Sequence, residues 1–158
     1  MRDIAEAAGC KTPTVYHHYK SKEQLFDEVV RQAYLELIAA LSASLPRGLH
    51  PAEYCTASLI QKKQLTPDDL LVHRLALKTW LGCEGCDEVR QRLIAWEQAR
   101  SSSNEGKLAE YLCSPAWARI ITRVFMELTI RIILFDDQID EAAIREEMDL
   151  VFKAATDR

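Results

Sequence analysis

The chain has 158 residues, of which 48% are hydrophobic and 28% are charged, and its formal net charge at pH 7 is −4. A chain of this size can bury a core of its own, which predicts one compact unit carrying a small head. It contains no run of about 18 uncharged apolar residues and no visible signal peptide, so we expect no membrane contact and a cytoplasmic location.

The first predicted element is a short helix over residues 2–8, where Ile4 and three nearby alanines form a small apolar face. Gly9 follows at the point where a helix end favours a residue that tolerates positive φ. Thr12 is predicted to cap a second helix through its hydroxyl, with Pro13 at the first helical position. The turn between the two helices then has the length that is usual in a helix-turn-helix motif.

In the second helix, Val15 and Tyr19 lie four residues apart and are expected to face inward, which leaves the polar side chains exposed. A third helix is expected to begin at Ser21, because its hydroxyl stands three residues before Gln24 in the spacing of a capping box. Lys22 in the first turn is then directed toward a phosphate. The local pattern is therefore that of a head that reads duplex DNA.

Three short motifs are the most specific feature of this region. They are Arg-Asp-Ile-Ala-x-x-Ala-Gly at residues 2–9, Thr-x-Tyr-x-His at residues 14–18 and Tyr-Lys-Ser-Lys at residues 19–22. In order and spacing they resemble the recognition signature of the TetR family of bacterial one-component repressors. The resemblance implies an all-α fold, a head with a connecting helix at residues 1–45, and a ligand-binding and dimerisation domain at residues 46–158.

The resemblance also implies the partners: an operator in double-stranded DNA, a small-molecule inducer and a second copy of the chain. Base-edge contacts are implied for Arg2, Thr12, Pro13 and Tyr16, and backbone contacts for Thr14, His18 and Lys22, with Lys11, His17 and Lys20 beside them. Arg2 suits either a guanine or a phosphate, and Tyr16 either a thymine methyl group or the small core of the head. Adjacent helical positions point about 100° apart, which argues against a metal ion shared by His17 and His18.

The sequence departs from the family pattern at its start. The family's head has three helices, whereas this chain begins at the second, with Met1 directly before Arg2. A head of two helices buries too little surface to be stable alone, so we expect that a helix upstream is missing from this chain. If it is also missing in nature, the alternative function is a dimeric ligand-binding or interaction module whose head no longer holds DNA.

Charge is unevenly distributed along the chain. Four basic and two acidic residues give residues 1–22 a charge of +2, which leaves −6 on residues 23–158. The basic N-terminal end is therefore the plausible surface for a polyanion.

Helical periodicity continues beyond the head. Residues 22–45 form an amphipathic pattern roughly 36 Å long at 1.5 Å per residue. After a break at residues 46–51, a helix is expected at 52–64, and a second begins with Thr66 as its cap and Pro67 at its first position. Leu71, Leu75 and Trp80 are predicted to form the inner face of that helix, and Gly82 to end it. Residues 101–106 either kink the next helix or divide it in two.

The last two helices predict a homodimer. Between residues 115 and 135 the charged residues recur every four positions, so the apolar surface is too wide for one contact. Two helices from each of two chains would form a four-helix bundle, although one chain can also bury these residues in its own core. The predicted interface comprises Trp117, Ile120, Ile121, Val124, Phe125, Leu128, Ile132, Ile144, Met148, Val151 and Phe152.

A ligand cavity inside the helical body follows from the resemblance. Its candidate lining is Tyr54, His73, Trp80, Trp96 and Arg123. These residues would supply aromatic walls and a few polar groups, but aromatic residues at helical spacing are also common in cores. Ligand binding would tilt the long helix that begins at Lys22 and change the distance between two heads.

The remaining chemistry is sparse. Cys83 and Cys86 have the spacing of a zinc half-site or a reversible disulfide, but two further metal ligands are not apparent, and a tight loop is the simpler interpretation. No nucleophile with a base and no phosphate-binding glycine loop appears, so we expect no catalytic residues, no resident metal and no cofactor.

Overall fold

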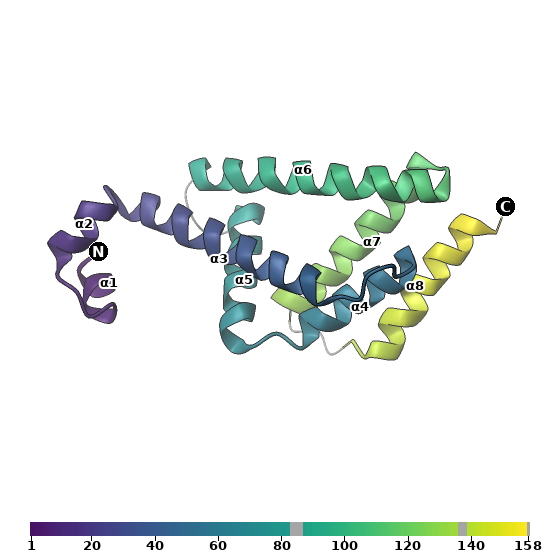
Figure 1. Cartoon of the computed structure of the whole chain (residues 1–158), viewed down its shortest axis with the longest axis horizontal. Coiled ribbons are helices and arrows are strands. Elements are labelled where there is room, and N and C mark those ends of the chain that lie inside the picture. The colour runs from purple at the N-terminus through teal and green to yellow at the C-terminus, as the bar shows by residue number, and fades with distance from the viewer. Residues whose placement is uncertain (83–86, 136–138, 158) are drawn as a thin grey trace.

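The computed structural model describes residues 1–82, 87–135 and 139–157 (Figure 1). Within these ranges the chain forms eight α-helices and no strand, which confirms the predicted all-α fold. In chain order the helices are α1 (Arg2–Ala7), α2 (Thr12–His18), α3 (Lys22–Ser44), α4 (Pro51–Lys63), α5 (Pro67–Leu81), α6 (Asp87–Leu112), α7 (Pro115–Leu134) and α8 (Glu141–Thr156).

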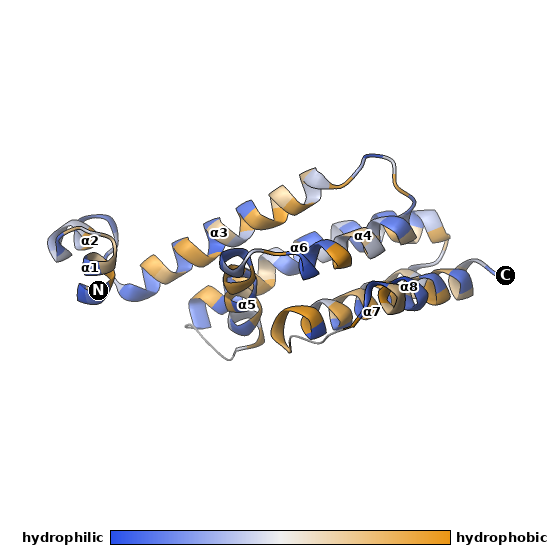
Figure 2. Cartoon of the chain, turned by 90° about the horizontal axis from the view of Figure 1, so that it is seen from below, coloured by the Kyte–Doolittle hydropathy of each residue, from blue (hydrophilic) through white to orange (hydrophobic). Residues whose placement is uncertain are grey.

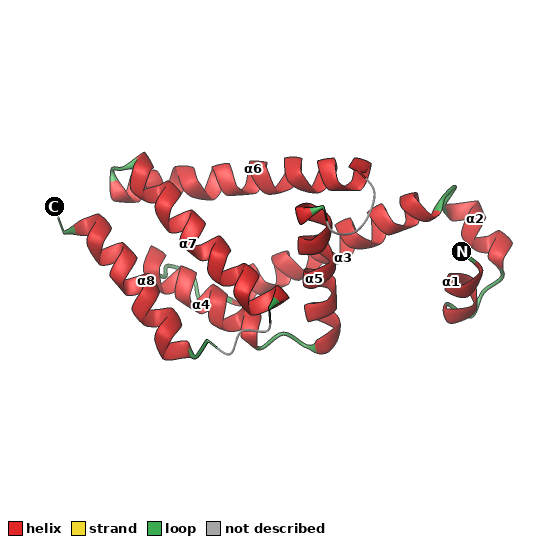
Figure 3. Ribbon diagram, turned by 180° about the vertical axis from the view of Figure 1, so that it is seen from behind, coloured by secondary structure: helices red, strands yellow, loops and turns green. Residues whose placement is uncertain are grey.

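Two parts of the molecule are distinct in space. Helices α1 and α2, which we call the head, lie at one end, and α3 connects them to helices α4 to α8, which we call the body (Figure 1). From behind, the head again stands apart at the end of α3 (Figure 3). The two head helices pack on each other, whereas α3 packs on α4, α5 and α6. Helix α3 is therefore the structural link between the head and the body.

Side-chain caps fix the starts of several helices. As predicted, the Ser21 hydroxyl accepts a hydrogen bond from the amide of Gln24 at 3.1 Å, and the Thr66 hydroxyl accepts one from the amide of Asp69 at 3.2 Å. His50 and Ser114 also cap helices, which the sequence did not indicate. The cap assigned to Thr12 was wrong: α2 begins one residue earlier than expected, after Lys11 in an extended conformation and without a side-chain cap.

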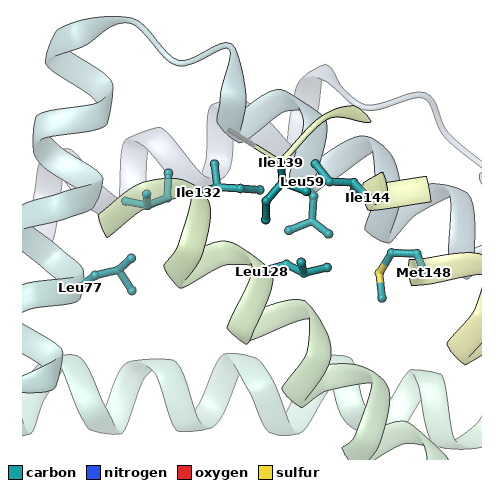
Figure 4. Close-up of a cluster of buried hydrophobic side chains, with 8 residues drawn as sticks. Leu59, Leu77, Leu128, Ile132, Ile139, Ile144 and Met148 are labelled. Carbon is teal, nitrogen blue, oxygen red and sulfur yellow. The ribbon is translucent and has the colours of Figure 1, made fainter. Parts of the chain in front are cut away.

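The largest core cluster lies between α4, α5, α7 and α8. Figure 4 shows its side chains converging between these helices. Its buried members are Leu59, Leu77, Leu128, Ile132, Ile133, Ile139, Ile144 and Met148. Since burying one large aliphatic side chain stabilises the fold by about 1.5–3 kcal/mol, this cluster is a major source of stability within a single chain.

The core changes the interpretation of the predicted dimer interface. Six of the residues assigned to it are buried in the single chain: Ile121, Leu128, Ile132, Ile144, Met148 and Phe152. Helix α7 packs on α4, α6 and α8 of its own chain, and Figure 2 shows how apolar this helix is. The sequence correctly indicated that α7 has a wide apolar surface that must be buried. In the structure, helices of the same chain bury most of it.

The other five residues of that set differ in position. Phe125 is half-buried and lines the cavity described below. Trp117, Val124 and Val151 are half-buried, and Ile120 is 43% exposed. Phe135 and Leu150 add further exposed apolar surface at the end of α7 and on α8. A smaller apolar surface therefore remains outside the core of the single chain.

Two helices of the body clarify or correct the sequence pattern. In α5, Leu71 is 65% exposed, so its assignment to the inner face was wrong; His73, Ala76 and Leu77 are buried on that face instead. Helix α6 is continuous through residues 101–106, which therefore do not divide it. None of the helices in the described ranges is both long enough and apolar enough to cross a bilayer.

Candidate functional site

The turn of the head is built around Gly9. Its φ of +63° confirms the predicted left-handed conformation, and its amide donates to the carbonyl of Glu6 at 3.0 Å. The amide of Cys10 donates to the carbonyl of Ala5 at 2.9 Å. This pair of bonds is the Schellman arrangement, which satisfies carbonyls at the end of α1 and reverses the chain toward α2.

Helix α2 presents its polar side chains to solvent. Val15 is its buried residue and Ala5 is the buried residue of α1, so the head has a very small core. Tyr16 is 49% exposed, which rules out the reading that packs it into that core. Of the residues expected to contact DNA, Thr12 is half-buried, and the others are exposed: Arg2, Lys11, Pro13, Thr14, Tyr16, His17, His18, Lys20 and Lys22. The fold thus gathers these side chains on one small unit.

The base of α3 is fixed to the body by a charged contact. Asp27 is buried, and Arg92 of α6 pairs with its carboxylate. The same guanidinium bonds Glu88 at 2.5 Å. Because Lys22, in the first turn of α3, precedes Asp27 by little more than one helical turn, this contact holds the head-bearing end of α3 against α6.

A cavity of about 430 Å³ lies between α3 and the body. Its lining comes from α3, α4, α5, α6 and α7, so one wall belongs to the helix that carries the head. Of the residues predicted to line it, Tyr54 and His73 do so. The assignments of three others were wrong, because Trp80 packs against the core, Trp96 packs edge-on against Tyr34, and Arg123 is exposed on α7.

The cavity has a buried polar end and an exposed mouth. Lys62, His73 and Thr129 are nearly inaccessible to solvent, whereas Tyr54 and Lys107 are exposed. Most of the remaining wall is apolar: Ile38, Leu41, Leu49, Leu77, Leu108, Ile121, Phe125 and Met126. This combination of an apolar wall and a few polar groups is typical of sites for small organic molecules.

Lys62 is the most unusual residue of the cavity. Only 6% of it is exposed, and its ammonium donates to the Ser58 hydroxyl at 3.0 Å and to the Ser58 carbonyl at 3.3 Å. It also lies 4.6 Å from the centre of the Phe125 ring. Burial, with a further contribution from the charge of Arg100, lowers the pKa of Lys62 to about 7. No described carboxylate forms an ion pair with it.

Two other buried groups at this end lack hydrogen-bond partners among the described residues. They are Nδ1 of His73 and the hydroxyl of Thr129. Burial lowers the pKa of His73 to about 3, with smaller contributions from the positive charges of Lys62 and Arg100, so its imidazole is neutral. Since buried polar groups are normally satisfied, these orphaned atoms are available to a guest in the cavity.

A hydrogen-bonded chain links the cavity to α3. The Tyr34 hydroxyl donates to the carboxylate of Glu97 at 3.0 Å, and the guanidinium of Arg100 donates to the same carboxylate at 2.7 Å. Arg100 and Tyr34 both line the cavity. Any group that competes for Arg100 therefore acts on the contact between α6 and α3.

Sequence reasoning missed Lys62 and Arg100 as cavity residues. Lys62 follows buried Leu59 by three positions and therefore lies on the inner face of α4, which was a usable signal. Arg100 follows Trp96 by four positions in the same way. Both were overlooked because charged residues are usually exposed.

The cysteines divide into described and undescribed ones. Cys83 and Cys86, the predicted half-site or disulfide, lie outside the described residues. Cys10, Cys55 and Cys113 are free thiols, and burial raises the pKa of Cys55 to about 11. Within the described ranges no three potential metal-ligating side chains converge.

Comparison with known proteins places the head in a family. Residues 1–29 match the family model of the bacterial regulatory proteins of the tetR family. The HTH-type transcriptional repressor KstR2 of Mycolicibacterium smegmatis is 39% identical over 56 residues, which cover 35% of this chain and 27% of that protein. KstR2 of Rhodococcus jostii is 39% identical over 49 residues, covering 31% of this chain and 24% of that protein.

A longer alignment extends into the body. The HTH-type transcriptional regulator BetI of Agrobacterium fabrum is 29% identical over 118 residues, which cover 73% of this chain and 55% of that protein. The chain thus spans about a quarter to about half of the length of these relatives. No solved structure gave a significant match. In its matched head, its helix-turn-helix geometry and its helical body, the chain is similar to transcriptional regulators of the tetR family.

Proposed function

We propose that the chain is a sequence-specific DNA-binding transcriptional regulator of the cytoplasm, and that the head reads the operator. The supporting observation is that α2 exposes Tyr16 and a group of polar and basic side chains on a compact unit whose turn is fixed by Gly9. An exposed helix of this kind fits the major groove, while the surrounding lysines suit phosphates. The tetR family model matches residues 1–29, which include this helix, and two relatives are named HTH-type transcriptional repressors.

The proposed regulator acts as a homodimer on a pseudo-palindromic operator. Two heads related by a twofold axis can occupy major grooves about 34 Å apart on one face of the DNA. The exposed apolar side chains Ile120, Phe135 and Leu150 on and beside α7 and α8 are the surface that we assign to the contact between copies. The division into a head with its connecting helix (residues 1–45) and a body (residues 46–158) is part of this proposal.

The proposed control is repression that a small molecule relieves. Tyr34 and Ile38 of α3 form part of the cavity wall, so a ligand that fills the cavity presses on the helix that carries the head. A shift of α3 changes the spacing of two heads and weakens their fit to successive grooves. By linkage, the ligand and the operator must then reduce each other's affinity by the same factor.

The experiment is a fluorescence anisotropy titration of the chain with labelled DNA from upstream of its own gene. Specific binding should persist against excess unrelated DNA, and its affinity should fall steeply with salt because several lysines on two heads displace counterions. Equal affinity for both DNAs, or no binding, would contradict the proposal. The alternative is then a dimeric ligand-binding or interaction module, which the very small buried core of the head favours.

A further inference from the structure

The charged side chains of the cavity wall are all positive. Three cationic residues line it, Lys62, Arg100 and Lys107, and none of its described lining residues is an aspartate or a glutamate. The Glu97 carboxylate acts on Lys62 and Arg100, but it is already bonded by Tyr34 and Arg100. The wall therefore offers more positive charge than its own carboxylates compensate.

The buried end of the cavity concentrates this charge. Lys62 from α4, His73 from α5 and Arg100 from α6 lie close enough that the two cations lower the pKa of the histidine. Lys62 donates hydrogen bonds only to the neutral acceptors of Ser58 among the described residues, and it lies over the ring of Phe125; the Glu97 carboxylate favours its charge from a distance but forms no ion pair with it. A buried ammonium without a counterion is costly, and an anionic guest would relieve that cost.

Hydrogen-bonding capacity at the same end points to the same kind of guest. The Thr129 hydroxyl and the Nδ1 atom of His73 are unsatisfied among the described residues. The hydroxyl can donate to an oxygen of the guest, and a neutral imidazole can donate from Nδ1 in the appropriate tautomer. These two potential donors and the ammonium of Lys62 line the same cavity, which suits an oxyanion rather than a cation.

The rest of the wall defines the body of the ligand. Apart from its charged and hydrogen-bonding groups, the lining is mainly aliphatic and aromatic, with Leu41, Ile121 and Phe125 among its members. A volume of about 430 Å³ lies within the range of about 300–1,000 Å³ that is usual for sites of small organic molecules. Burial of an apolar ligand body against such a wall would favour binding.

We infer that the cavity binds an amphipathic carboxylate, whose anionic group pairs with Lys62 and Arg100 at the buried end and whose apolar body extends toward the mouth. This inference rests on the proposed function only in naming the ligand class of the same regulator; the binding itself is a property of the body. Competition of the carboxylate with Glu97 for Arg100 gives the ligand access to the Tyr34 contact on α3.

The test is isothermal calorimetry on the DNA-free chain with molecules of matched body and different charge. The aliphatic series is octanoate, 1-octanol and octyltrimethylammonium, and the aromatic series is 2-naphthoate and 2-naphthol. In at least one series the carboxylate should bind about tenfold or more tightly than its neutral counterpart. The inference is overturned if the neutral molecule binds as tightly as the carboxylate in both series, if octyltrimethylammonium binds as tightly as octanoate, or if neither carboxylate binds.

Two matched variants test whether the preference for a carboxylate depends on the buried lysine. The carboxylate that wild type binds more tightly than its neutral counterpart should bind Lys62→Met about tenfold or more weakly than it binds wild type. The affinity of the neutral counterpart should stay within about threefold of its wild-type value. Lys153→Met, an identical change at an exposed position on α8, should leave both affinities unchanged. Because Lys62→Met removes a buried charge, it should fold. An unchanged carboxylate affinity in folded Lys62→Met, judged by circular dichroism, also overturns the inference.

A separate anisotropy titration distinguishes the two proposals. If a carboxylate binds in a Lys62-dependent way but leaves DNA affinity unchanged, the inference holds and the proposed control by ligand fails. If DNA is released by neutral molecules and not by carboxylates, the inference fails while ligand-controlled DNA binding stands. If no DNA is bound at all, the calorimetric result still decides the ligand class.

Discussion

The head and the cavity differ in how their residues are distributed along the chain. The exposed side chains of the head all lie within residues 2–22, and one glycine turn brings them together. The cavity draws its wall from five helices between Tyr34 and Thr129, and its charged end joins Lys62, His73 and Arg100 from three of them. The head is therefore a local structure, whereas the cavity exists only when the body is folded.

The two regions also differ in how they hold charge. The lysines of the head are exposed, so their charge is hydrated and adds little strain to the fold. Lys62 is buried, and its lowered pKa reflects a penalty borne by the folded chain. Removing charge should consequently weaken DNA binding in the head but stabilise the unliganded body.

The largest expected effect is on the stability of the body. Lys62→Met should raise the free energy of unfolding of the unliganded chain at pH 7 by about 4 kcal/mol, because a pKa displaced from 10.5 to about 7 corresponds to a penalty of this order. Urea denaturation followed by circular dichroism measures the change. Lys153→Met is the matched control and should change the free energy by less than about 0.5 kcal/mol. A destabilised Lys62→Met would show that the lysine contributes more to packing than its desolvation costs.

The next effect concerns the head alone. Tyr16→Ala should lower operator affinity about a hundredfold in a dimer, since each head loses a contact worth about 1–3 kcal/mol. Thermal unfolding of the body should not change, because Tyr16 is half-exposed and lies outside it. Fluorescence anisotropy measures the affinity, and calorimetry the unfolding.

Tyr111→Ala is the counterpart on the body. Tyr111 lies on α6 and is 46% exposed, close to the 49% of Tyr16. Its removal costs the contact with His50 but should leave operator affinity within about twofold. Equal losses of affinity in the two variants would mean that exposed tyrosines act on DNA binding through general stability and not through a groove contact.

The same contrast explains what could be predicted from sequence. Caps and glycines are local signals, so Ser21, Thr66 and Gly9 were placed as the structure has them. The head residues could be grouped from the sequence because their motif is contiguous; their contacts with DNA stay a prediction. Burial of Lys62 depends on which helices cover α4, and that information is not contained in the sequence of α4 itself.

The errors have the same physical origin. Ile144 and Met148 were correctly expected to be buried, but periodicity does not say whether the covering surface belongs to the same chain or to a partner. Trp80 and Trp96 were correctly read as inward-facing residues, yet each packs into a cluster and not into the cavity. Periodicity identifies an inner face; the tertiary fold decides what that face contacts.

A pH titration sharpens the comparison of charge. Between pH 7 and 9 the unfolded chain retains the Lys62 proton that the folded chain has lost, so the stability of the unliganded chain should rise with pH by up to about 1 kcal/mol per unit. His73 loses its proton well below this range, and the Cys55 thiol deprotonates above it. Urea denaturation at pH 7, 8 and 9 measures the slope. Lys62→Met should lack this contribution, and identical slopes in the two proteins would assign the pH dependence to other groups.

The smallest expected effect tests whether the head unfolds independently of the body. Gly9→Ala places a β-carbon in open space, so its cost is that of holding alanine at a φ of +63°, about 1 kcal/mol. Hydrogen exchange of residues 1–20 should accelerate about fivefold, while exchange in α5 should stay unchanged if the head opens by itself. Gly48→Ala is matched, with a φ of +79° and equally open space, but it lies in the loop before α4. Gly48→Ala should leave hydrogen exchange in the head unchanged. Faster exchange in the head of this variant would mean that the head and the body unfold as one cooperative unit.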